Sequence, residues 1–81
     1  MDDKEILHRI SALVDEEHGL RTRAQAGQID SAEEHDRLRD LEVALDQCWD
    51  LLRQRRAARE SGADPGAAQA RPVSEVEGYL Q

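Results

Sequence analysis

The chain has 81 residues and a mass of 9.1 kDa, which is enough for one small domain. Apolar residues make up 38% of it, with no Phe, one Trp and one Tyr, so few large side chains are available for a core, which argues against most classes of enzyme. The 18 acidic and 11 basic residues give a net charge of −7, which opposes general binding to nucleic-acid phosphates.

The sequence also argues against a membrane or secreted protein. It contains no apolar run long enough to cross a bilayer, and its N-terminus is acidic where a signal peptide would be basic. Cys48 is the only cysteine, so no disulfide can form within the chain, and we expect its thiol to be a small buried hydrophobe. These features favour a soluble cytoplasmic protein without a cofactor.

Residues 3–26 predict the first helix, because apolar residues recur there at the spacing of a coiled coil: Ile6, Ile10, Leu13, Leu20 and Ala24. Glu17 occupies the place of the missing apolar residue. We expect it to be half-buried and paired with Arg21 or Arg37, or to meet a basic group of a second chain. Gly27 is the expected helix stop.

A second helix is predicted over residues 32–60, after a turn at 27–31. Ser31 and Glu34 have the spacing of a capping box, which predicts that Ser31 begins the helix. Its apolar seam consists of Leu38, Leu41, Leu45, Cys48 and Leu52. Small and helix-breaking residues follow from Ser61 to Gly66.

The short turn predicts an antiparallel two-helix hairpin, an all-α and coiled-coil-like fold. In such a hairpin the numbers of facing residues have a constant sum, and a sum of 58 places Ile6 opposite Leu52 and Ile10 opposite Cys48. A lone hairpin buries little apolar surface. We therefore expect it to dimerise into a four-helix bundle through residues beside the seam, namely Leu7, Val14, Ala44, Trp49 and Leu51.

Residues 61–72 are small, polar and interrupted by Pro, so they predict a linker. Residues 73–81 regain apolar side chains, and Ser74 and Glu77 have the spacing of another capping box. This end is either a frayed terminus or a flexible docking segment that contacts its own hairpin or another protein through Val76, Tyr79 and Leu80.

Two kinds of chemistry have candidate residues. Glu17, His18, Glu34 and His35 contain metal-binding groups, but their spacing does not suit a site within one chain, so only a site across chains stays open. The basic cluster of Arg53, Arg55, Arg56 and Arg59 would attract phosphate in a nucleic-acid or transcription-associated regulator. The alternative is that these arginines complement the helix dipole and pair with Asp2, Asp3 and Glu5.

Three stretches carry a resemblance to a known family: residues 13–18, residues 41–56, and residues 76–81 with the sequence Val-Glu-Gly-Tyr-Leu-Gln. The chain resembles a family of small uncharacterised bacterial helical-hairpin proteins, a domain of unknown function found mainly in high-GC Gram-positive bacteria. The resemblance implies the hairpin fold, but the family brings no activity, cofactor or catalytic residues that could be carried over to this chain. We expect a non-enzymatic interaction or scaffold protein, with contacts through Glu17, Trp49, Leu51, Arg53, Arg55, Arg56 and the C-terminal residues above.

Overall fold

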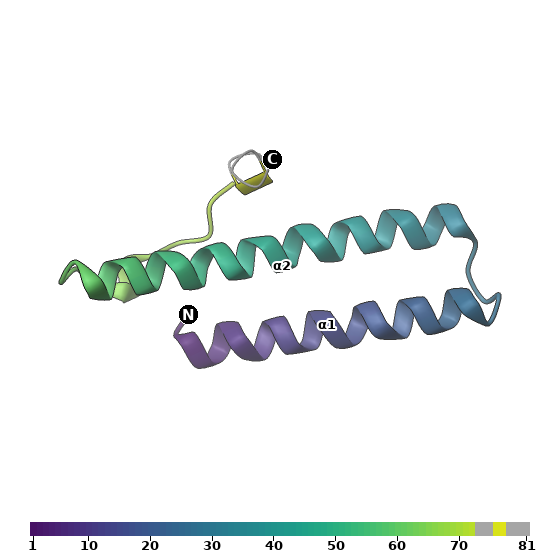
Figure 1. Ribbon diagram of the computed structural model, residues 1–81, viewed down its shortest axis with the longest axis horizontal. Helices are drawn as coiled ribbons and strands as arrows, with labels where there is room; N and C mark the ends of the chain where they lie inside the picture. The colour runs from purple at the N-terminus through teal and green to yellow at the C-terminus, as the bar shows by residue number, and fades with distance from the viewer. Residues whose placement is uncertain (73–75, 78–81) are drawn as a thin grey trace.

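The computed structural model is an antiparallel hairpin of two helices, α1 (Asp3–Gln25) and α2 (Ser31–Glu60), followed by a short 3-10 helix, η1 (Pro65–Ala67) (Figure 1). The structure describes residues 1–72 and 76–77, and no strand occurs among them. The all-α hairpin is therefore confirmed, with helix bounds that differ by one residue from the predicted ranges.

Both ends of α1 are capped by local hydrogen bonds. Asp2 accepts a hydrogen bond from the Glu5 backbone at 2.8 Å, while Glu5 accepts one from the Asp2 backbone at 3.3 Å, so the two residues form a capping box. At the other end Gly27 has a φ of 73°, and the Gln28 amide donates to the Arg23 carbonyl at 2.9 Å. The helix stop predicted at Gly27 is confirmed, because glycine adopts this conformation without strain.

The start of α2 differs from the prediction. The residue that caps the helix is Asp30, whose carboxylate accepts a hydrogen bond from the Glu33 backbone at 2.7 Å. Ser31 is already the first helical residue, so the capping box predicted for Ser31 and Glu34 is wrong. Asp30 immediately precedes the helix, so its carboxylate can accept from the amide of the third helical residue. Its negative charge also interacts favourably with the positive end of the helix dipole.

This difference is directly testable. We expect Asp30→Ala to lower the free energy of unfolding by about 1 kcal/mol, because an amide of the first turn loses its acceptor. Ser31→Ala should change the same quantity by only a few tenths, since Ser31 makes no capping hydrogen bond. Urea denaturation followed by circular dichroism measures both variants. A larger loss for Ser31→Ala than for Asp30→Ala would restore the capping box that the sequence suggested.

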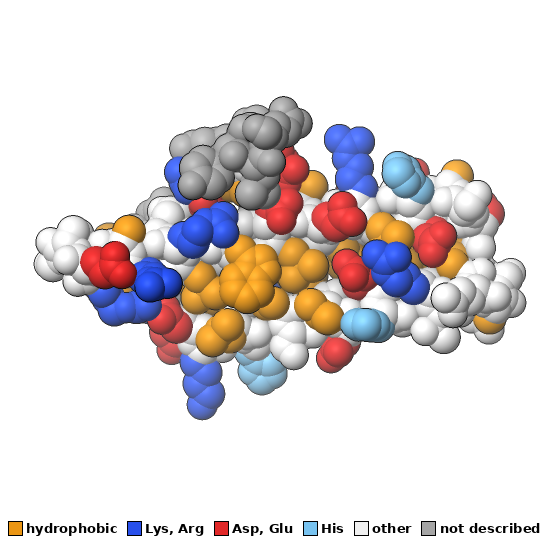
Figure 2. Space-filling view, in the orientation of Figure 1, with side chains coloured by type: hydrophobic (Ala, Val, Ile, Leu, Met, Phe, Trp, Pro, Cys, Tyr) orange, Lys and Arg blue, Asp and Glu red, His pale blue; other side chains and the backbone are white. Residues whose placement is uncertain are grey.

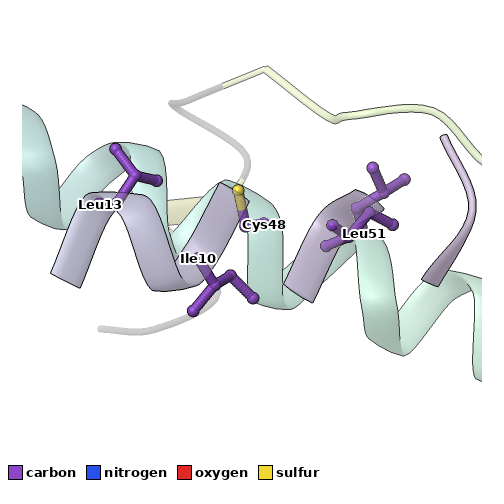
Figure 3. Close-up of a cluster of buried hydrophobic side chains, with 5 residues drawn as sticks. Ile10, Leu13, Cys48 and Leu51 are labelled. Carbon is purple, nitrogen blue, oxygen red and sulfur yellow. The ribbon is translucent and has the colours of Figure 1, made fainter. Parts of the chain in front are cut away.

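The core lies between the two helices and is formed by residues of the predicted seam together with Leu51. Its buried residues include Ile10 and Leu13 of α1 together with Cys48 and Leu51 of α2, which lie together in Figure 3. Ile6 is 0% exposed and completes this cluster. Asp3 pairs with Arg55 across the helices, and these two numbers again add to 58. Asp3 also pairs with Arg59, one turn further along α2, so the two ends of the hairpin lie close to the predicted level.

One assignment along the seam is corrected. Leu51 was expected beside the seam as a contact for another chain, but it is buried in the core, whereas Leu52 is half-buried. The reason is that the chain after α2 returns along this side of the hairpin. Ala68 packs against the core cluster, and Ala70 lines a small hollow together with Leu51. Leu51 is therefore covered by residues of its own chain and is not left for a contact with another one.

The return begins at Gly62, whose φ of 79° ends α2 in the same way that Gly27 ends α1. Three side chains of α2 then bind backbone carbonyls of residues 61–72, the segment predicted to be a linker. Arg55 donates to Pro65 at 3.0 Å, Gln54 to Gln69 at 2.9 Å and Gln47 to Arg71 at 3.3 Å. We call residues 61–72 and 76–77 the returning segment. Its path along α2 is visible in Figure 1.

Candidate functional site

Asp50 is the buried charged residue to which the returning segment is attached. It is 1% exposed, although it lies on α2 among apolar neighbours. The Arg71 guanidinium donates two hydrogen bonds to its carboxylate, one of them from Nε at 2.9 Å. Gln54 donates a third, also at 2.9 Å, so the buried carboxylate is well satisfied.

Hydrogen bonds from Arg71 hold the pKa of Asp50 below its ordinary value, against the opposing effect of burial. A carboxyl whose pKa is lowered by folding stabilises the folded state above its ordinary pKa. That stabilisation is lost as the pH falls through the lowered value. The attachment of the returning segment at Asp50 is therefore present at neutral pH and weakens in acid.

The far end of the returning segment also packs against α2. Val76 is 1% exposed, and its amide donates to the Pro72 carbonyl at 3.2 Å. Glu77 is half-buried beside Asp46, and its Oε1 is buried without a hydrogen-bond donor among the described residues. A hydrogen bond shared with the Asp46 carboxyl raises the pKa of Glu77, and desolvation raises it further. This contact therefore has the opposite pH dependence, since it weakens as the pH rises through the raised pKa.

Glu77→Gln tests this contact. The amide of Gln can donate to Asp46 at any pH, so we expect the variant to hold the end of the returning segment more firmly at neutral pH. The measurement is the hydrogen-exchange protection of the Val76 amide, which should rise in the variant. In acid, where Glu77 of the natural chain is protonated, the difference should disappear. Glu16→Gln on α1 removes the same charge and is the control that should leave this protection unchanged.

An apolar surface lies on another side of the hairpin. Leu7 is 50% exposed and Trp49 is 45% exposed, while Val14, Leu45 and Leu52 are half-buried against the core. The helical repeat places Leu7 with Val14 on α1, and Leu45 with Trp49 and Leu52 on α2. Figure 2 shows an apolar patch that spans both helices in the middle of this side. We call these five residues the uncovered face.

The four arginines near the end of α2 have different surroundings. Arg55 and Arg59 both bind Asp3, at 2.5 and 2.7 Å. These pairs confirm, for two of the four, the interpretation that the arginines complement α1, and they lower the pKa of Asp3, with Arg59 the larger cause. Arg56 pairs with Glu60 at 3.2 Å on the surface, and Arg53 lies 4.0 Å from Asp50. The side chain of Arg56 is 79% exposed, those of Arg53 and Arg59 are about half exposed, and that of Arg55 is 11% exposed, so the four arginines differ in their access to a partner.

The remaining candidate residues from the sequence are Glu17, Cys48, the possible metal ligands and the C-terminal residues. Glu17 is half-buried, and Arg21 approaches it at 3.7 Å, as expected for one of its two predicted partners. Cys48 is buried in the core, as predicted. Within the described residues no group of three or more His, Cys, Asp or Glu side chains is arranged to hold a metal ion. Tyr79 and Leu80, and the cap predicted at Ser74, lie outside the described residues.

A groove between the helices opens near the turn. Leu20 and Leu41 contribute apolar side chains to it, and its charged residues are Glu16, Arg23, Arg37 and Asp40. Gly19 also lines the groove. The space beside it is open, since a Cβ atom at this position would meet nothing within 4 Å. Thr22 lines the groove as well, and its hydroxyl donates to the His18 carbonyl at 2.9 Å.

Comparisons with known proteins place the chain in a family. Residues 2–81 match the model of the family described as "Protein of unknown function (DUF2630)". The chain belongs to this family. An uncharacterized protein of Mycobacterium bovis and one from each of two Mycobacterium tuberculosis strains are 53% identical to it over 77 residues, which cover 95% of this chain and 88% of each relative. No solved structure matches. The resemblance stated from the sequence is confirmed.

In this member of the family, sequence reasoning missed the residues that attach the returning segment. Asp50 and Arg71 are separated by 21 positions, and no local pattern links them. The only available signal was an Asp within the apolar stretch from Cys48 to Leu52. No helix among the described residues is both long enough and apolar enough to span a membrane.

Proposed function

We propose that this chain is a non-enzymatic protein–protein interaction module that self-associates through the uncovered face into a four-helix bundle. The observation that carries the proposal is the exposure of Trp49 at the centre of that face, since 45% of its surface is accessible. Trp is the residue most enriched among the energetically dominant contacts of interfaces, and an exposed Trp flanked by leucines marks a contact surface.

The composition of the face suits another copy of the same hairpin. Its two helical stripes have the spacing that packs against a second pair of helices in a bundle. A symmetric dimer covers both faces at once, because the same patch contacts its own copy. The half-buried Val14, Leu45 and Leu52 would then become fully buried, which adds the apolar burial that a small hairpin needs.

The C-terminal segment is the second part of the proposal. We interpret it as a docking element, and the burial of Val76 together with the Arg71–Asp50 pair supports docking on its own hairpin. The described part of the segment makes its contacts with Gln47, Asp50 and Gln54, on the side of α2 opposite to Trp49. The cytoplasmic location favoured by the sequence stays a prediction.

The experiment is light scattering after size-exclusion chromatography over a range of protein concentrations. We expect a mass of twice 9.1 kDa for the natural chain and a mass of 9.1 kDa for Trp49→Glu. Both proteins should have the helical circular dichroism of the hairpin, because Trp49 lies outside the buried core. Ala12→Glu adds the same charge at an exposed position of α1 and should remain a dimer. A natural chain that stays at 9.1 kDa at every concentration would overturn the proposal.

A further inference from the structure

Charge is distributed unevenly along the hairpin. The half that contains the turn, residues 13–46, has ten acidic and four basic side chains and a net charge of −6. The other half, residues 1–12 and 47–60, has five acidic and six basic side chains and a net charge of +1. We call these halves the turn end and the arginine end. The antiparallel register brings each set of residues together in space, so the division is a property of the folded hairpin.

The same asymmetry exists beside the uncovered face. At the arginine end, the side chains of Arg53 and Arg56 are 49% and 79% exposed. Arg56 is partly neutralised by Glu60, whereas Arg53 only approaches Asp50 at 4.0 Å. At the turn end, Glu42 is exposed and lies one helical turn before Leu45, and Asp15 is exposed next to Val14. Arg21 also lies at this end, but Glu17 pairs with it.

These charges distinguish two ways of joining two uncovered faces. If both hairpins point in the same direction, the two turn ends lie together and two net charges of −6 face each other. If they point in opposite directions, each turn end lies over an arginine end of +1. Packed helices are separated by about 8 to 10 Å, which is within or close to the screening length of physiological salt, so the difference is not removed by ions.

We propose that the partner of the uncovered face is a second copy of this chain running in the opposite direction, with the turn end of each copy over the arginine end of the other. This inference rests on the self-association proposed above and adds its geometry. The two-fold axis is then perpendicular to the helices and passes near the middle of the face. Trp49 lies between Leu45 and Leu52 in the middle of the face, so the axis brings the two tryptophans close to each other.

Spin labels at the two ends of the hairpin test the arrangement. Gln28→Cys places a label in the turn, and Ser61→Cys places one just after α2; both positions are exposed, and Cys48→Ala removes the buried native thiol. Dimers of Gln28→Cys alone should give a label-to-label distance above roughly 40 Å, because α2 is 30 residues long. Mixed dimers of Gln28→Cys with Ser61→Cys should instead give a distance below about 20 Å.

The outcomes separate this inference from the proposed function. A short distance between two Gln28→Cys labels in a chain that scatters light as a dimer would overturn the opposite orientation and leave self-association standing. A labelled chain with the mass of a monomer would overturn both. Trp49→Glu in the same labelled background should lose every distance, which checks that the labels report on the uncovered face and not on another contact.

Discussion

Replacing Ile6 with Ala is expected to lower the free energy of unfolding by about 2 to 5 kcal/mol, while replacing the neighbouring Leu7 should cost the isolated hairpin less than about 0.5 kcal/mol. The two residues are adjacent in the sequence, but Ile6 is 0% exposed and Leu7 is 50% exposed. Truncating Ile6 leaves a cavity beside Cys48 and Leu51, whereas truncating Leu7 removes atoms that water already contacts. Urea denaturation at a dilution that keeps the chain monomeric measures both.

The same two variants, Ile6→Ala and Leu7→Ala, also test self-association when they are compared at high protein concentration. If two copies join through the uncovered face, Leu7→Ala should become costly there, since Leu7 is then buried by the partner. The cost of Ile6→Ala should stay the same. Equal losses for the two variants in the dilute protein would contradict the helix orientation described here, because that result requires Leu7 and Ile6 to be buried alike.

Arg71→Ala is expected to weaken the attachment of the returning segment by about 1 to 3 kcal/mol, because the carboxylate of Asp50 would lose two of its three donors. Arg71 is 38% exposed, so solvent screening favours the lower part of this range. The measurement is limited proteolysis within residues 61–72 together with exchange of the Ala68 amide, which donates to Pro65. Both rates should rise while the helical signal of α1 and α2 is retained.

Acid titration provides an independent check. The natural chain should lose the attachment as the pH falls through the lowered pKa of Asp50, and Arg71→Ala should not show that step. Arg53→Ala is the matched control, since Arg53 is also a cation near Asp50 but lies at 4.0 Å and is 49% exposed. Its effect should stay below about 1 kcal/mol. An effect of Arg53→Ala as large as that of Arg71→Ala would show that general charge, not the bidentate contact, holds the segment.

Local sequence patterns were sufficient for the hairpin because each of its determinants is local. The apolar spacing defines one face per helix, Gly27 ends α1, and the shortness of the turn forces antiparallel packing. The error at the start of α2 was avoidable, since Asp30 stands three residues before Glu33, the same spacing that Ser31 has to Glu34, and its charge also suits the helix N-terminus. Asp2 and Glu5 show the complete capping box that was sought at Ser31.

The returning segment could not be predicted in this way. Its attachment depends on Gln47, Asp50 and Gln54, which the helical repeat places on one side of α2, and on backbone carbonyls that carry no sequence signal. The segment is rich in small residues, which suit a linker and a closely packed extended chain equally well. The sequence prediction placed Leu52 in the core in place of Leu51 because it did not include the returning segment. Which of the two leucines is buried depends on the side of the hairpin that this segment covers.

The turn at Gly62 sends the chain back along the side of α2 that carries Gln47 and Gln54, away from the side that carries Trp49. The attachment of the returning segment and the contact proposed for Trp49 therefore use opposite sides of α2. Truncation of Arg71 and truncation of Trp49 should have nearly additive effects, because the two side chains make no common contact across α2. If the chain also self-associates as proposed, a protein that binds its C-terminal segment would bind a pair of hairpins with each segment.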